Sequence, residues 1–187
     1  MAHLAAWAAA ATLLPPAFAA SPALYAASAA AQARPLAPAQ RLERRFLQIA
    51  TANLRFQAEA SRLVDARSNN PAVKEVAGAV LARDRAAQPD LLRLLHARSM
   101  APPIPVPAHT RVMKRLAKLN GAKFDRLYID DVVLATFRAD LLNYEKLALE
   151  AEDPVLKQWV QGQLPTLRVD YGKAQRALPG NLRRQGL

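Results

Sequence analysis

The sequence contains no cysteine among its 187 residues. This absence excludes disulfide bridges, thiolate metal sites, cysteine nucleophiles and dithiol redox motifs. Glycine is also scarce, with 6 residues against 14 prolines, and no alternating apolar pattern bounded by hairpin turns occurs. We therefore expect helices separated by proline-marked breaks. The length and the 52% of hydrophobic residues are enough for one domain with a substantial core.

The first 33 residues carry no Lys, Arg, Asp or Glu. They contain an apolar run from Leu4 to Leu14, followed by Ala17-Phe18-Ala19, a small-x-small pattern typical of signal-peptide cleavage. We expect residues 1–33 to be a signal peptide and alanine-rich leader, cut after Ala19 or, as a second option, after Ala33. No run of about 18 strongly apolar residues occurs, because prolines interrupt the stretch. Export to the periplasm or outside the cell is therefore favoured over the alternative of an N-terminal membrane anchor.

Apolar residues recur at alternating steps of three and four along most of the remaining chain, which is the spacing of one helix face. The pattern predicts long helices over about residues 39–67, 71–99, 122–150 and 154–178. Asn70 and Asp153 are each followed by proline, an arrangement typical of a helix cap and a first helical residue. Pro89 and Pro165 lie inside predicted helices; Pro89 is expected to kink or break its helix, and Pro165 to kink its own.

A proline-rich stretch at residues 101–107 separates the second and third long helices and predicts a stiff extended crossover. A short helix follows over about residues 108–119 and is expected to end at Asn120-Gly121. Four long helices with one long crossover is the ferritin-like topology. The predicted fold is therefore all-α, a ferritin-like four-helix bundle over residues 38–178 with this crossover and short extra helix. A flexible basic tail is expected at residues 179–187.

Two polar residues occupy positions of the apolar repeat. Asn53 stands between Ile49 and Phe56 in the first long helix, and Asp84 stands between Val80 and Ala87 in the second. Both side chains are therefore expected to face the interior of the bundle.

Three motifs carry a resemblance to a known family: Asn-Pro-x-Val-Lys, Gly-x-x-Phe-Asp-Arg-x-Tyr and Leu-Pro-Thr-Leu. On these residues, the chain from about Phe46 to Leu178 resembles the family catalogued as domain of unknown function 4142. The resemblance implies an exported, ferritin-like helical protein of bacteria without a known reaction. Members commonly carry an Asp-His pair in the second helix and single histidines in the third and fourth. The matching positions here are Arg83-Asp84, at or beside Thr136, and Asp170, so all three histidines are replaced.

A metal centre of the di-iron type needs Glu-x-x-His pairs, and none of the 15 acidic residues has a histidine three positions later. A site made of carboxylates alone, from Glu59, Asp84 and Asp170, would favour a divalent cation such as Ca, Mg or Mn. The favoured alternative is that Asp84 pairs with an arginine such as Arg55 or Arg138, and that Asp170 is solvated. No other cofactor is expected.

Catalysis is not supported, because the sequence has no phosphate-binding glycine loop, nucleophile elbow or zinc-protease pair. The formal charge of +11 favours anionic partners. In the short helix, four cations share one face opposite an apolar stripe, which suits an anionic membrane surface: Arg111, Lys114, Arg115 and Lys118. Alternatively, the stripe packs on the bundle and the cations are merely solvated. Nucleic acid is disfavoured, because export removes the usual partner.

These observations predict an exported, non-catalytic binding or envelope-associated protein whose biochemical role the sequence does not define. The alternative is a protein that binds a divalent cation through carboxylates between its helices.

Overall fold

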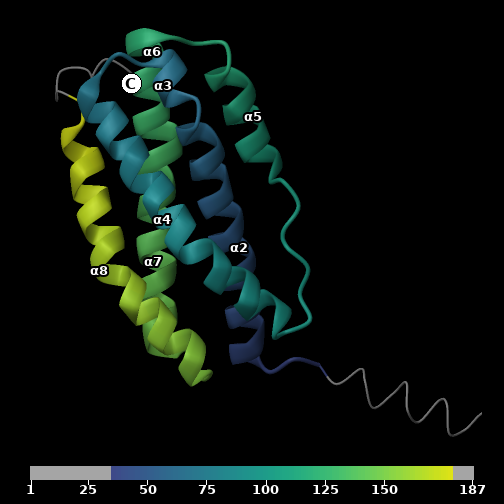
Figure 1. Cartoon of the computed structure of the whole chain (residues 1–187). Coiled ribbons are helices and arrows are strands. Elements are labelled where there is room, and N and C mark those ends of the chain that lie inside the picture. The colour runs from purple at the N-terminus through teal and green to yellow at the C-terminus, as the bar shows by residue number, and fades with distance from the viewer. Residues whose placement is uncertain (1–34, 179–187) are drawn as a thin grey trace, which may run out of the picture. The chain divides into compact units, whose positions relative to one another are not determined.

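Helices account for all regular secondary structure in residues 35–178, the part of the chain that the computed structural model describes. In chain order they are α2 (Pro38–Ser61), α3 (Val64–Arg67), α4 (Pro71–His96), α5 (Pro107–Leu116), α6 (Gly121–Leu127), the π-helical segment η1 (Tyr128–Leu134), α7 (Ala135–Glu150) and α8 (Pro154–Arg176) (Figure 1). The all-α prediction is confirmed. The predicted leader and the basic tail lie outside the described residues.

The two helix caps predicted from the sequence are present at the start of α4 and of α8. The Asn70 side chain accepts a hydrogen bond from the backbone of Ala72 at 3.0 Å. The Asp153 carboxylate accepts from two backbone N–H groups of the first turn of α8, at 2.9 and 3.0 Å. Such a cap contributes about 1 kcal/mol. Pro89 and Pro165 lie inside α4 and α8, and neither proline ends its helix. Pro89 therefore does not break α4, and a kink at either proline stays a prediction.

The boundaries differ from the prediction at three places. The first long helix ends at Ser61, and after a turn the short α3 follows. Helix α5 ends at Leu116, and Gly121, with a φ of 56°, lies at the start of α6 instead of ending a helix. A non-glycine residue rarely adopts such a φ. The third predicted helix is continuous from residue 121 to 150 but contains the π-helical segment η1, which the apolar spacing did not indicate.

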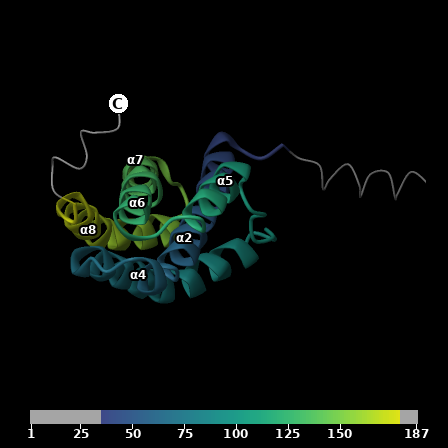
Figure 2. The same cartoon turned by 90° about the horizontal axis from the view of Figure 1, so that it is seen from above.

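Side chains from all the long helices form one hydrophobic core. Helix α2 packs against α4 and α7, and α8 packs against α7 and α4. Seen from above in Figure 2, α5 lies beside α2 on the side away from α8. The largest fully buried side chains of the core include Leu47, Leu91, Ile129, Phe137 and Leu167, and each contributes about 1.5–3 kcal/mol by leaving water.

The crossover, residues 100–106, contains neither helix nor strand, as predicted. It connects the end of α4 to the start of α5. The Gln48 side chain of α2 donates a hydrogen bond to the Ala101 carbonyl at 3.2 Å, and Arg44 donates to the Arg98 carbonyl at 2.8 Å. These bonds fix the start of the crossover to α2. In the described range, no helix combines the length and apolar character needed to cross a bilayer.

Candidate functional site

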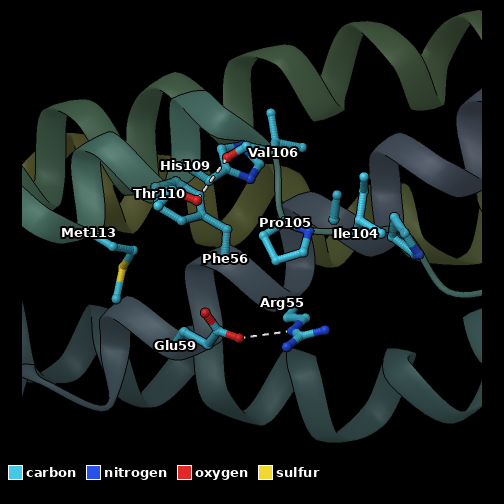
Figure 3. Close-up of a pocket in the computed structure, with 11 residues that line it drawn as sticks. Arg55, Phe56, Glu59, Ile104, Pro105, Val106, His109, Thr110 and Met113 are labelled. Atoms are coloured by element: carbon cyan, nitrogen blue, oxygen red, sulfur yellow. Dashed lines mark hydrogen bonds and ion pairs between the residues drawn. The ribbon is translucent and has the colours of Figure 1, made fainter.

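Two pockets lie on either side of the crossover. The first, called pocket A, has a volume of about 260 Å³ and lies between α2, the crossover and α5 (Figure 3). Its lining is mostly apolar and consists of Ala52, Arg55, Phe56, Glu59, Pro103, Ile104, Pro105, Val106, His109, Thr110 and Met113. The polar edge comes from Arg55 and Glu59, which form an ion pair with an N–O distance of 2.8 Å.

The histidine of pocket A is part of an aromatic stack. The rings of Phe56 and His109 lie nearly parallel, with 4.1 Å between their centroids. Burial lowers the pKa of His109 from its ordinary value, so the imidazole is neutral at pH 7. Thr110 turns its hydroxyl back to the Val106 carbonyl at 3.3 Å. The α5 wall of pocket A is therefore uncharged.

The cations predicted for the short helix point to solvent, while the apolar stripe faces the bundle. Helix α5 ends at Leu116, so Lys118 and Leu119 follow the helix and do not belong to it. Arg111, Lys114, Arg115 and Lys118 are all exposed. Leu116 is fully buried, and Val112 and Leu119 pack partly buried against the core. The apolar stripe therefore packs on the bundle, and the binding of the cations to an anionic surface stays a prediction. Arg115 lies 3.4 Å from Asp131 of η1, which balances part of its charge.

The exposed side of the crossover carries an apolar side chain near the start of α5. Ile104 is 85% exposed, the highest value among the large hydrophobic residues of the described range. It is also a lining residue of pocket A, together with three residues of α5. An isolated exposed isoleucine is ordinary, but here it stands next to a cationic helix.

The second pocket, called pocket B, has a volume of about 200 Å³ and lies between α2, α4 and the crossover. Glu59 and Asp84, two of the residues proposed as metal ligands, both line it. Asp84 is only 4% exposed, as its place in the repeat predicted. Its Oδ2 lies 3.5 Å from the guanidinium of Arg62. The prediction that Asp84 pairs with an arginine is therefore confirmed. The partner is Arg62, so the suggested partners Arg55 and Arg138 are wrong.

The carboxylate of Asp84 is not fully satisfied. Its Oδ1 is buried and accepts no hydrogen bond from the described residues. Burial raises the pKa of Asp84, and the charges of Arg62, Arg83 and Arg85 oppose this rise. A buried polar atom without a partner costs about 1–3 kcal/mol. In pocket B this applies to Oδ1 of Asp84 and to the hydroxyl of Thr51, which also lacks a partner among the described residues.

The third proposed ligand, Asp170, lies on α8 and does not line pocket B. It is 7% exposed, so the expectation that it is solvated is wrong. Burial raises its pKa, while the charges of Arg83 and Lys173 lower it. Within residues 35–178, no group of three or more Asp, Glu or His side chains comes together in a way that could hold a metal ion. The structure therefore does not bring Glu59, Asp84 and Asp170 together.

A buried polar cluster, called the Arg83 cluster, connects α2, α4 and α7. The Arg83 side chain is 8% exposed and lies 4.0 Å from the carboxylate of Asp140. Its guanidinium donates to the Gln57 side chain and lies 4.6 Å from the ring centroid of Phe137. Asn53 donates to Asp140 at 2.6 Å. The sequence indicated the buried Asn53 but did not identify its partner.

Burial dominates the ionisation of Asp140. It raises the pKa of this carboxyl to about 6, although Arg83 and the hydrogen bond from Asn53 both act in the opposite direction. The separation of 4.0 Å from Arg83 is too long for a hydrogen bond. Charge attraction alone therefore does not compensate for the lost hydration of the carboxylate.

The profile of the family described as "Domain of unknown function (DUF4142)" matches residues 26–177. This range covers most of the chain. The chain belongs to the DUF4142 family. Among curated proteins, none matches it.

The DUF4142 chain also resembles a solved structure, the crystal structure of a DUF305 protein from Streptomyces coelicolor that is described as inferred to be secreted. The two share 14% sequence identity at a TM-score of 0.57, over 69% of this chain and 86% of the other. At this level of identity the likeness concerns the helical fold alone.

In this DUF4142 chain, Arg83 stands where the resemblance implies the aspartate of the Asp-His pair, and Asp84 stands where it implies the histidine. Thr136 of α7, at or beside the position of the second histidine, is buried. The charge of Arg83 acts on Asp84. The charge of Arg83 also acts on Asp170. A fixed positive charge in this place does not suit a metal ion, which would need the same carboxylates as ligands. The donor set around Arg83 therefore does not fit a bound cation.

Proposed function

We propose that this DUF4142 protein is an exported, non-catalytic protein with a ferritin-like four-helix bundle, which binds an anionic surface of the cell envelope through α5 and the crossover. Export is supported by the signal-peptide pattern of residues 1–33 and by the description of the DUF305 neighbour. The bundle is supported by the packing of α2, α4, α7 and α8 around one core.

One observation carries the binding role. The four cations of α5 and of the turn after it are exposed, and the 85% exposed Ile104 lies on the crossover that leads into the same helix, while the apolar stripe of this helix packs against the core. A membrane-surface site combines these two features: cations contact anionic head groups, and an apolar side chain enters the interface. Each cation near an anionic surface contributes about 1 kcal/mol.

A non-catalytic role agrees with the distribution of perturbed groups. Asp140 and Tyr144, whose pKa values burial raises, belong to the interior and line neither pocket. In an enzyme, such perturbed groups are usually found in the substrate cleft. The groups with the largest shifts lie outside both pockets, whereas His109 lines pocket A and Asp84 lines pocket B.

Vesicle co-sedimentation tests the proposal. The protein is expected to bind vesicles containing phosphatidylglycerol and to bind pure phosphatidylcholine vesicles much more weakly. Salt should release it, because raising the ionic strength from about 0.1 M to about 1 M shortens the Debye length from about 10 Å to about 3 Å. Equal binding to both vesicle types, or binding that resists salt, would show that α5 does not recognise charge.

A matched pair of variants locates the surface. Lys114→Ala with Lys118→Ala removes two exposed cations and should weaken binding about 30-fold, which corresponds to about 2 kcal/mol. Lys74→Ala with Lys146→Ala removes the same charge from exposed positions on α4 and α7. If both pairs weaken binding equally, the net charge of the protein is responsible and the assignment to α5 is wrong.

A further inference from the structure

We propose that pocket B binds a free α-amino acid with an apolar side chain, whose ammonium group contacts Asp84 and whose carboxylate contacts Arg62. This inference concerns a different site from the membrane-binding surface and does not depend on it. It rests on the buried carboxylate of Asp84, on the balance of charges around the pocket and on the apolar side chains of its walls.

The ammonium position is defined by Asp84. This side chain is almost fully buried, lines pocket B, and has one oxygen, Oδ1, that accepts no hydrogen bond from the described residues. Oδ1 is enclosed by protein atoms, so the carboxylate must turn about its Cβ–Cγ bond to present this oxygen to pocket B. A primary ammonium group, which carries three donors, can then satisfy it. Charge-assisted bonds of this kind are about twice as strong as neutral ones.

The carboxylate position is defined by the arginines at the rim. Arg62 is within 3.5 Å of Asp84 but makes no hydrogen bond with it, and its side chain is 58% exposed. It can therefore turn toward a ligand carboxylate, for which the planar guanidinium provides paired donors. Arg55 and Glu59 also line pocket B and already form their own hydrogen-bonded pair.

The charges of these four side chains balance. Asp84 and Glu59 contribute two negative charges, and Arg55 and Arg62 contribute two positive ones. A ligand with a net charge would leave one of these groups uncompensated, whereas a zwitterion meets both signs. The same arginines disfavour a bare divalent cation, because they place positive charge directly beside the only two carboxylates of the pocket.

The rest of pocket B suits an apolar substituent of small size. Its walls include the buried Leu54, Ala58 and Leu91 of α2 and α4, and Pro102 and Pro103 of the crossover. The volume of about 200 Å³ lies below the range of about 300–1,000 Å³ that is usual for drug-sized ligands. A molecule of the size of a single amino acid therefore fits this space better than a peptide or a nucleotide.

Isothermal titration calorimetry of the purified full-length chain tests the inference with three related probes. L-leucine carries both charged groups, 4-methylpentanoate lacks the ammonium group, and 3-methylbutylamine lacks the carboxylate. Leucine is expected to bind at least tenfold more tightly than either analogue. L-methionine and L-phenylalanine are tested in parallel, because the apolar walls do not select one side-chain shape. Absence of binding by all three amino acids would overturn the inference.

Variants assign the contacts. Asp84→Asn keeps the size of the side chain and should weaken leucine binding at least tenfold, and Arg62→Gln should do the same. Glu75→Gln, an exposed change on α4 outside pocket B, should leave it unchanged. Circular dichroism melts establish that each variant is folded. Unchanged leucine binding by the Asp84→Asn protein, or binding of the amine as tight as that of leucine, would overturn the assignment.

Discussion

The Arg83 cluster makes a quantitative prediction about the pH dependence of stability. Burial raises the pKa of Asp140 to about 6 from an ordinary 3.8. Because the folded state binds this proton more tightly than the unfolded state does, Asp140 favours folding below pH 4. This contribution is lost as the pH rises from about 4 to about 6. The difference in pKa corresponds to about 3 kcal/mol, at 1.36 kcal/mol per pKa unit.

The variant Asp140→Asn isolates this contribution. An asparagine at this position retains a carbonyl oxygen that can accept the hydrogen bond from Asn53, but it cannot ionise. Other titrating groups, including Asp84 and Asp170, are present in both proteins, so their contributions largely cancel in the difference. The free energy of unfolding of the variant, measured relative to that of the wild type, should therefore rise by about 3 kcal/mol between pH 3.5 and pH 7. This expected rise does not depend on how far apart the two proteins are at either pH.

Urea unfolding followed by circular dichroism at several pH values provides the measurement. Linear extrapolation gives the free energy of unfolding of each protein at each pH. If the difference between the two proteins does not change with pH, Asp140 does not titrate in this window. If it changes in the opposite direction, Arg83 stabilises the ionised carboxylate more than burial disfavours it. Either result would refute the reasoning about the cluster.

Two further predictions concern the connections between helices. Glu43 of α2 is buried and accepts backbone hydrogen bonds from Glu152 and Asp153 at 3.0 and 2.9 Å. Glu43→Ala should therefore lower the free energy of unfolding by about 2–4 kcal/mol, as measured in urea, because it leaves two N–H groups without an acceptor; Glu43→Gln, which retains an acceptor, should cost clearly less, and equal losses would contradict this role. Gly121→Ala should lower the free energy of unfolding by about 1–2 kcal/mol, because the φ of 56° is strained for alanine. The control Gly162→Ala, in open space inside α8, should instead be neutral or stabilising by up to about 1 kcal/mol, and a loss at both positions would show that backbone strain is not the cause.

The periodicity of the sequence was sufficient to find polar residues that face the interior. Asn53 and Asp84 each occupied a place that an apolar residue would fill, and both are buried. Their partners could not be derived in the same way. Asp140 lies on α7, within a predicted helix whose apolar residues surround most of its circumference, so spacing assigned it to no face. The segment η1 also changes the number of residues per turn just before Asp140.

The candidate sites depended on contacts that only tertiary structure defines. Asp170 was expected to be solvated near Pro165, but packing buries it and places it within the influence of Arg83. Pocket B requires α2, α4 and the crossover to meet, and nothing in the local sequence of any one of them indicates the other two. The exposed cations of α5, in contrast, followed directly from helical spacing within ten residues.

The positive charge inside the Arg83 cluster belongs to a side chain of the protein, the guanidinium of Arg83. A bundle that depended on a bound ion would reach its final charge balance only after the ion had been acquired, and would lose that balance wherever the ion was scarce. Arg83 supplies its charge in every copy from the time of synthesis, and a guanidinium does not deprotonate in proteins. The positive charge beside Asp140 is therefore present without any supply from the surroundings, which is an advantage for a protein expected to fold outside the cytoplasm.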